Sequence, residues 1–233
     1  MQAARKAIRT GEGRRPFGHP REGWTFGLEN GSVVPMDVQH PLTGVVLAGG
    51  KSARLGQDKC ALSLGGVDML TRTVRLLGAL LGDIMVIGRE YPGVACIPDD
   101  VPGAGPVGAV TTALRHAGGP CLVLSCDLPF MREETLSLLL RAWERKTPGT
   151  LVTAFRHDRT GKKENLVAVY EPDALARLEP CLAKNLLKLA LIIPEGRYAF
   201  VPIPPDAEKD FFNINTPGDL LRARSGFAAL PRP

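Results

Sequence analysis

From residue 43 onward, short apolar runs alternate with longer segments in which apolar residues recur at helical spacing. The short runs have the length and the β-branched character of buried strands, and the longer segments have the period of amphipathic helices. The strands are predicted at 43–48, 84–87, 94–97 and 121–126, and the helices at 68–81, 105–116 and 132–146. This alternation predicts an α/β domain with a mostly parallel, doubly wound sheet.

The pattern is less regular after residue 150. Strands are predicted at 151–155, 166–170 and 198–203, and helices at 172–181, at 184–192 and from about residue 216. Asp68 is a candidate N-cap, and Thr216 followed by Pro217 is a typical helix start. With no internal repeat, residues 41–226 are predicted to form one domain, followed by a short tail at 227–233.

Residues 1–40 are rich in glycine, proline and arginine and show no helical or strand period, which predicts disorder or loose packing. Residues 1–21 carry six basic side chains against one acidic one, so most of the net charge of +5 lies in this leader. Because the remainder is close to neutral, nucleic-acid binding by the folded part is not expected. Met36, just before the first predicted strand, is a candidate for the true start of the chain, and the leader is assigned no function.

Composition narrows the possible classes of protein and the kinds of site that the chain can contain. No long apolar segment is present, so a membrane span is not expected. The five cysteines form no Cys-x-x-Cys pair and the histidines do not cluster near them, which argues against a zinc site. Cys121 and Cys126 lie in an apolar run and are expected to be buried free thiols. An odd cysteine count without a secretory signal favours a reducing cytoplasm.

The chemistry is predicted to centre on residues 43–59. Gly49 and Gly50 directly follow the first strand, and a glycine pair lets backbone N–H groups approach a ligand because no Cβ intervenes. Three cationic side chains follow, those of Lys51, Arg54 and Lys59. This pattern describes a cradle for a triphosphate at the carboxyl edge of a sheet. The spacing matches neither the P-loop nor the dinucleotide fingerprint, and a glycine turn followed by surface lysines is the alternative.

The run Leu47-Ala-Gly-Gly-Lys-Ser-Ala-Arg-Leu-Gly-Gln-Asp-Lys59 resembles the opening motif of the MobA-like nucleotidyltransferases, the molybdenum cofactor guanylyltransferases. Three further motifs follow in the family's order, and the resemblance spans about residues 43–225. It implies a single three-layer, Rossmann-like domain of the nucleotide-diphospho-sugar transferase type. It also implies a nucleotide-binding set: Leu47, Ala48, Gly49, Gly50, Lys51, Lys59, Asp99, Gly105 and Asp127.

Asp127 ends the apolar run 121–126, where a carboxylate is well placed to hold Mg²⁺ on a triphosphate. An aspartate before Pro129 is equally typical of an ordinary turn or a helix N-cap. The run Ser125-Cys-Asp-Leu-Pro129 resembles the Cys-Asp-x-Pro metal-binding motif of the family, and this resemblance implies that Asp127 is the metal ligand.

Two further motifs are shorter. An aspartate ahead of Gly105-Pro-Val-Gly108 resembles the residue that contacts the guanosine end of the nucleotide; the spacing favours Asp99 over Asp100. Asn213 and Asn215 alternate at a predicted strand end and can project two amides into one cleft, although turn hydrogen bonds are the alternative. The resemblance implies that an asparagine here helps to hold the metal or positions the acceptor phosphate.

The resemblance implies transfer of GMP from GTP to the terminal phosphate of molybdopterin, delivered by a carrier or insertion protein. The predicted catalytic residues are Arg54, Lys59, Asp127 and Asn215, with Asn213 and Asn215 on the acceptor side. Positioning and charge neutralisation would provide most of the catalysis, and no Ser-His or Cys-His pair is evident.

Two departures from the family pattern weaken the assignment of the acceptor. Asn165 stands where relatives usually have a proline, and residues 183–191 lack their basic segment. A cytidylyl- or sugar-phosphate nucleotidyltransferase of the same fold and a non-catalytic nucleotide-binding partner are the alternatives.

Overall fold

The computed structural model describes residues 26–29, 32–35, 42–49 and 55–228. The chain divides into two compact units, Met1–Val38 and Gln39–Pro233. In the first unit, β1 (Phe26–Glu29) pairs with β2 (Ser32–Pro35) as an antiparallel hairpin. No strand was predicted in this region, although the dipeptide Asn30-Gly31 between the two runs is a typical sequence signal of a hairpin.

The second unit is built on a sheet of seven strands in the order β11-β9-β10-β8-β3-β6-β7. In chain order these are β3 (Thr43–Leu47), β6 (Ile84–Ile87), β7 (Ala95–Ile97), β8 (Cys121–Ser125), β9 (Val152–Arg156), β10 (Lys163–Tyr170) and β11 (Tyr198–Pro202). The neighbours pair in parallel except in the two pairs that β10 makes, with β8 and with β9. The prediction of a mostly parallel sheet is confirmed.

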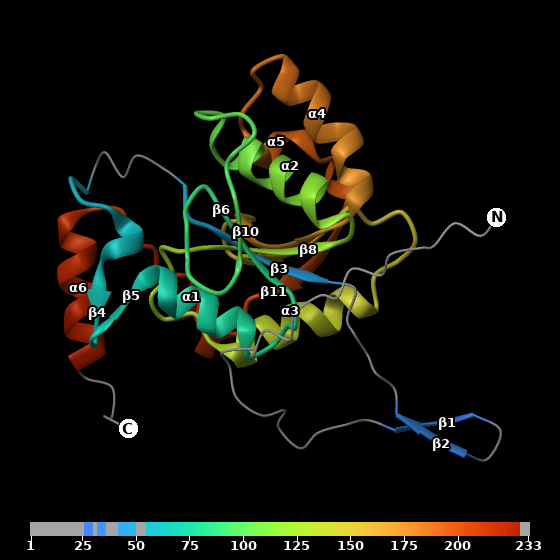
Figure 1. Ribbon diagram of the computed structural model, residues 1–233, viewed down its shortest axis with the longest axis horizontal. Helices are drawn as coiled ribbons and strands as arrows, with labels where there is room; N and C mark the ends of the chain where they lie inside the picture. Colours follow the sequence, from blue (N-terminus) through green and yellow to red (C-terminus); the bar gives the residue numbers. More distant parts are fainter. Residues whose placement is uncertain (1–25, 30–31, 36–41, 50–54, 229–233) are drawn as a thin grey trace, which may run out of the picture. The chain divides into compact units, whose positions relative to one another are not determined.

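Helices cover both faces of this sheet (Figure 1). One face carries α1 (Met69–Gly78) and α3 (Glu133–Glu144). The opposite face carries α2 (Gly105–Ala117), α4 (Leu175–Ala183) and the short α5 (Leu189–Ile192). The last helix, α6 (Pro217–Ala228), packs against β4 (Ser63–Leu64), which pairs with β5 (Val67–Asp68). The predicted three-layer α/β fold is confirmed.

The side-chain alternation of β8 shows how one strand supplies both cores. Leu122 and Leu124 pack in the cluster that includes α1 and α3, whereas Cys121 and Val123 pack in the cluster that includes α2 and α4. All four residues are at most 1% exposed. Successive side chains of a strand point to opposite faces, so a continuous apolar run is what a sheet with helices on both faces requires.

The predicted start of α1 is also confirmed. The Asp68 side chain accepts hydrogen bonds from the backbone N–H of Thr71 and from its hydroxyl, both at 2.8 Å. This N-cap satisfies a donor that the first helical turn leaves without an intrahelical partner, and such caps contribute about 1 kcal/mol.

Two local predictions were wrong. The helix expected at 184–192 is only α5, because α4 ends in a Schellman motif with Asn185 in the left-handed region (φ 55°). There the N–H of Leu186 bonds the carbonyl of Cys181 at 2.8 Å, and the N–H of Asn185 bonds that of Leu182 at 3.0 Å. Strand β10 begins at residue 163 rather than 166.

The direction of β10 determines which of its residues lie at the carboxyl edge of the sheet. Val167 pairs with Leu124 and Tyr170 pairs with Cys121, so the chain enters β10 at the edge where β8 ends. The first residues of β10 therefore lie at the same edge as the carboxyl ends of the parallel strands β3, β6 and β8.

The backbone at this edge is tightly packed around Gly88, which follows β6. Gly88 has φ +85°, and a Cβ added there would lie 3.1 Å from the Cα of Gly49. We expect Gly88→Ala to lower the free energy of unfolding by about 2 kcal/mol or more, measured by urea denaturation.

The matched control is Gly82→Ala, where an added Cβ meets no atom within 4 Å. We expect this control to change stability by about 0.5 kcal/mol or less. Equal losses in the two variants would contradict the close approach of Gly88 to Gly49.

Candidate functional site

The carboxyl ends of β3 and β8 bring two loops together. After β3, the N–H of Ala48 bonds the carbonyl of Ile87 at 3.0 Å, which keeps the chain against β6 for one more residue. Leu47 and Ala48 are buried, and Gly49 is exposed. At the end of β8, the carbonyl of Asp127 accepts the N–H of Ile214 at 3.0 Å. This bond fastens the segment before α6 to the same edge.

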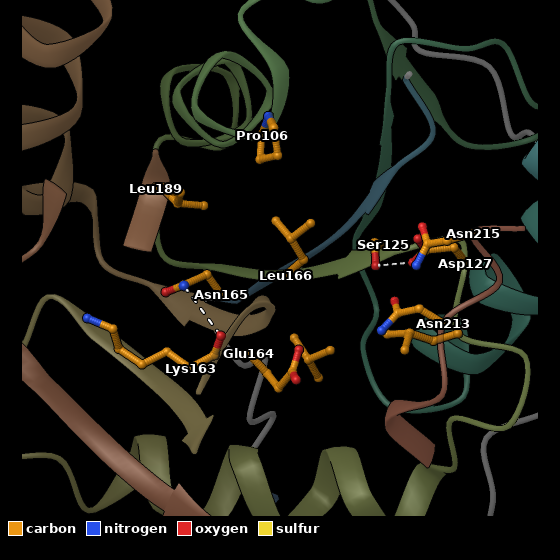
Figure 2. A pocket seen from close by; sticks show the side chains of 12 residues that line it. Pro106, Ser125, Asp127, Lys163, Glu164, Asn165, Leu166, Leu189, Asn213 and Asn215 are labelled. Atoms are coloured by element: carbon orange, nitrogen blue, oxygen red, sulfur yellow. Dashed lines mark hydrogen bonds between the residues drawn. The ribbon is translucent and has the colours of Figure 1, made fainter. Parts of the chain in front are cut away.

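Three side chains from distant parts of the sequence meet there. Lys59 begins a 3₁₀ turn (Lys59–Ala61), and its Nζ lies 3.0 Å from Oδ2 of Asp127 and 2.6 Å from Oδ1 of Asn215. The other Asp127 oxygen accepts the hydroxyl of Ser125 at 2.8 Å (Figure 2). The Lys59 and Asp127 side chains are only 20% and 19% exposed. A cation and a carboxylate are thus held together at the mouth of the sheet.

Asn215 is positioned by the start of α6. The Asp219 carboxylate accepts the N–H of Asn215 at 3.1 Å, the N–H of Thr216 at 2.9 Å and the hydroxyl of Thr216 at 2.8 Å. The N–H of Asp219 in turn donates to the Thr216 hydroxyl, which completes a reciprocal cap. The hydrogen bond from the Thr216 hydroxyl, followed by that from the Asn215 N–H, lowers the pKa of Asp219 to about 2.

A cavity of about 360 Å³ opens beside Asp127. One side is formed by the end of β8 and by the asparagines before α6, and the other by the first half of β10 (Figure 2). The lining residues are Pro106, Ser125, Asp127, Leu128, Lys163, Glu164, Asn165, Leu166, Val167, Leu189, Asn213 and Asn215. Its walls therefore combine two carboxylates, one ammonium group and three amides with apolar side chains from β10, α2 and α5.

On the β10 side, two tyrosines fix Asn165. The Tyr198 hydroxyl donates to Oδ1 of Asn165 at 2.9 Å, and the Tyr170 hydroxyl donates to its carbonyl at 2.8 Å. Burial raises the pKa of Tyr198 to about 12, so its hydroxyl stays protonated and remains a donor. Glu164 is held in turn by His157 and Lys162, whose nitrogens each lie 2.7 Å from Oε1.

Behind the Lys59–Asp127 pair lie two thiols. The Sγ atoms of Cys60 and Cys126 are 2.8 Å apart, and the two residues are 4% and 6% exposed. The prediction that Cys121 and Cys126 are buried free thiols is confirmed. Burial raises the pKa of Cys121 to about 12.

The comparison with known proteins decides the family. The model of the MobA-like NTP transferase domain matches residues 44–192. The chain belongs to the MobA-like NTP transferase family. A "probable molybdenum cofactor guanylyltransferase" of Pelotomaculum thermopropionicum is 33% identical over 193 residues, which are 78% of this chain and 91% of the relative.

Solved structures agree with this membership. The molybdopterin-guanine dinucleotide biosynthesis protein A of Archaeoglobus fulgidus matches with a TM-score of 0.69 and 26% identity, over 81% of this chain and 100% of that one. The 2-C-methyl-D-erythritol 4-phosphate cytidylyltransferase of Thermus thermophilus matches with a TM-score of 0.55 and 18% identity, over 80% and 98% of the two chains. The second likeness shows the fold alone.

The structure of this MobA-like chain brings together four of the predicted site residues, Lys59, Asp127, Asn213 and Asn215. Five others, Leu47, Ala48, Gly49, Asp99 and Gly105, are not among the residues that line the cavity. Asp99 accepts the N–H of Val101 at 3.2 Å, beside the start of α2, and Gly105 begins α2 with φ +60°. Gly50, Lys51 and Arg54 lie outside the described residues.

The structure distinguishes the two neighbouring aspartates, whose register the sequence left open. Asp100 faces α2, with one carboxylate oxygen 3.4 Å from Arg115 and the other 3.3 Å from His116. Asp99 instead approaches the α2 residue Thr112, whose hydroxyl donates to it at 3.4 Å. Asp100 is thus committed to an ion pair with Arg115 and a hydrogen bond with His116 on the surface of α2.

Sequence reasoning missed the β10 wall of the cavity. Asn165 was noticed only as a departure from the family pattern, and Lys163 and Glu164 were not considered. The sequence signal for this wall was weak because the residues of a strand do not indicate whether it runs parallel or antiparallel to its neighbours. Only the reversal of β10 places its first residues opposite Asp127.

The oxygen atoms near Asp127 fit a divalent cation that arrives with a phosphate ligand. The Asp127 carboxylate and the Asn215 amide oxygen converge on one positive charge, the Lys59 ammonium group. Mg²⁺ is typically bound by one or two carboxylates together with substrate phosphates. Within the described residues, no three His, Cys, Asp or Glu side chains gather into a closed metal site, so the phosphates would supply the missing ligands.

The capping of α6 predicts a pH dependence. Because the folded pKa of Asp219 is about 2, below its ordinary value of 3.8, its contribution to stability is present above pH 4 and lost as the pH falls toward 2. We expect Asp219→Asn to lower the melting temperature at pH 6, with a gap from the wild type that narrows toward pH 2.

Asp158→Asn, in the exposed loop between β9 and β10, is the control. We expect it to leave the melting temperature unchanged at pH 6. A gap between wild type and Asp219→Asn that stays constant from pH 6 to pH 2 would contradict the depressed pKa.

Proposed function

We propose that this protein transfers GMP from GTP to the terminal phosphate of molybdopterin, forming the guanine dinucleotide cofactor and releasing pyrophosphate. The observation that carries the proposal is the meeting of Lys59, Asp127 and Asn215 at the carboxyl edge of the sheet in a MobA-like chain. The names of the relatives supply the base and the acceptor: the Pelotomaculum protein is named for guanylyl transfer, and the Archaeoglobus protein for the guanine dinucleotide.

The reaction needs little covalent chemistry from the protein. An oxygen of the acceptor phosphate attacks the α-phosphorus of GTP, the bond from that phosphorus to the β-phosphate oxygen breaks, and pyrophosphate leaves with the bonding electrons. A phosphate monoester is already anionic at neutral pH, so no general base is required. Catalysis then depends on bringing two anionic groups together and offsetting their repulsion.

Lys59 supplies part of that positive charge. Its Nζ is held by Asp127 and Asn215 rather than left to sample many rotamers, so its charge is already in place when phosphate binds. Arg54 and Lys51, from the same loop, are proposed to add charge around the β- and γ-phosphates. The backbone N–H groups of Gly49 and Gly50 would contact the phosphates directly.

Asp127 and Asn215 are the residues that would hold Mg²⁺. When bound, the ion would neutralise the charge of the phosphate oxygens and draw the two reacting groups together. Ser125 orients the Asp127 carboxylate through the hydrogen bond to its other oxygen. Asn213, on the same cavity wall, is proposed to contact the acceptor phosphate.

The β10 wall is proposed to receive the pterin end of the acceptor. It presents two polar side chains: that of Asn165, held by the Tyr198 hydroxyl, and that of Glu164, held by His157 and Lys162. The apolar Leu166 and Leu189 line the same cavity and suit the faces of a planar ring. A carrier or insertion protein is proposed to deliver the acceptor in the cytoplasm. No helix within the described residues is long and apolar enough to cross a membrane.

The test is pyrophosphate release by the purified protein with Mg²⁺ and GTP, CTP, ATP or UTP, each with and without carrier-bound molybdopterin. We expect acceptor-dependent release from GTP, reduced about 100-fold or more in Asp127→Asn. The control is Asp83→Asn, which removes a carboxylate next to the opposite end of β6. We expect this control to leave turnover unchanged. Preference for CTP would make the protein a cytidylyltransferase, and GTP binding without turnover would make it a nucleotide-binding partner.

The acceptor wall gives a separate prediction. We expect Asn165→Ala to raise KM for the acceptor about tenfold while KM for GTP stays the same, because one polar contact of about 1.4 kcal/mol is lost on one side of the cavity only. The control is Asn185→Ala in the surface turn after α4. A rise in KM for GTP instead would place the nucleotide, not the acceptor, against β10.

A further inference from the structure

The mechanism proposed above leaves two buried nucleophiles unused. The thiols of Cys60 and Cys126 face each other at 2.8 Å, well inside the ordinary contact distance of two sulfur atoms. A disulfide has an S–S length of about 2.05 Å, so bond formation needs an approach of only about 0.8 Å. The two residues belong to segments 66 positions apart in the chain, and the fold alone brings them together.

The other three cysteines do not share this arrangement. The Cys121 thiol donates to the carbonyl of Gly119 at 3.7 Å, and the Cys96 thiol lies 3.3 Å from the carbonyl of Tyr91. Cys181 is half-exposed on α4. Within the part of the chain that the structure describes, Cys60 and Cys126 form the one thiol pair at bonding range.

The position of the pair gives it a consequence. Cys60 follows Lys59 directly, and Cys126 directly precedes Asp127. Each thiol is therefore one residue from a partner of the 3.0 Å ion pair at the mouth of the sheet. A bond between the sulfurs would draw the 3₁₀ turn that carries Lys59 toward the end of β8.

We propose that Cys60 and Cys126 form a site of reversible oxidation, converted to a disulfide by a small hydroperoxide such as hydrogen peroxide. One thiol loses its proton and the thiolate attacks a peroxide oxygen; the O–O bond breaks, a sulfenic acid forms, and the departing hydroxide takes up that proton as the first water. The second sulfur then attacks the sulfenic sulfur, and its proton and the departing hydroxide form water. Two thiols are oxidised and one peroxide is reduced to two waters. Burial of both residues favours a small oxidant over a bulky disulfide.

The disulfide is expected to suppress transfer. A displacement of about 1 Å between catalytic groups is enough to lower a rate about 100-fold, and the approach of the sulfurs acts on Lys59 and Asp127 together. This effect on activity rests on the proposed function; formation of the disulfide does not. In a reducing compartment the bond would be broken again by thiol exchange.

The experiment treats the reduced, full-length protein with hydrogen peroxide and counts alkylatable thiols after denaturation. We expect the count to fall from five to three, a Cys60–Cys126 cross-linked peptide in the mass spectrum, and recovery of all thiols with dithiothreitol. Cys60→Ala is expected to abolish the cross-link, and the matched buried variant Cys121→Ala to retain it. A parallel arm with oxidised glutathione is expected to react more slowly.

The transfer assay on the same samples separates the two proposals. Loss of GMP transfer of about tenfold or more on oxidation, restored by dithiothreitol, would support the inference in full. Thiol loss confined to Cys96 or Cys181, or loss that dithiothreitol does not reverse, would overturn it. If oxidation forms the Cys60–Cys126 cross-link but the protein has no transfer activity even before oxidation, the proposed function is refuted and the oxidation site stands.

Discussion

The ion pair between Lys59 and Asp127 is the contact on which the site depends. It joins the end of the glycine loop to the end of the central strand β8, and Asn215 ties in the segment that enters α6. Both charged side chains are about one-fifth exposed, so water screens the pair only in part. No one of the three segments could place its polar group without the other two. The sheet provides the common edge, and the charges determine how the loops meet there.

A second constraint is the single reversed strand. If β10 ran parallel to its neighbours, its carboxyl end would lie beside Asp127, and the residues after Tyr170 would line the cavity. Because it runs antiparallel, the cavity receives Lys163 to Val167 instead. The two halves of the cavity thus have different origins. The strand-end half follows the general rule for parallel α/β sheets, and the β10 half is particular to this topology.

These origins explain how far the sequence could be used for prediction. Strands β3, β6 and β8 and helix α1 are strongly periodic, and they lie where the pattern of apolar residues predicted. Lys59 could be identified because it ends the long motif at 47–59. Asp127 could be identified from the strand end and the Cys-Asp-x-Pro resemblance, and Asn215 from the short Asn213–Asn215 pattern. Asn165 could not be identified in this way. Nothing near it in the sequence indicates the direction of β10 or the hydrogen bond that its side chain accepts from the Tyr198 hydroxyl. The turn at Asn185 was not predicted because it lies inside an apolar segment whose pattern resembles a continuous helix. The sequence does not show that Asn185 adopts a left-handed backbone conformation.

The reversal of β10 also separates two kinds of evolutionary change. Residues 157–162 connect β9 to the beginning of β10 at the cavity edge. Surface loops tolerate insertion and substitution far better than packed strands. Such changes would reshape one wall of the cavity while Lys59, Asp127 and Asn215 kept their positions. A fold arranged in this way can acquire new acceptors by drift in one hairpin, with the nucleotide chemistry inherited unchanged.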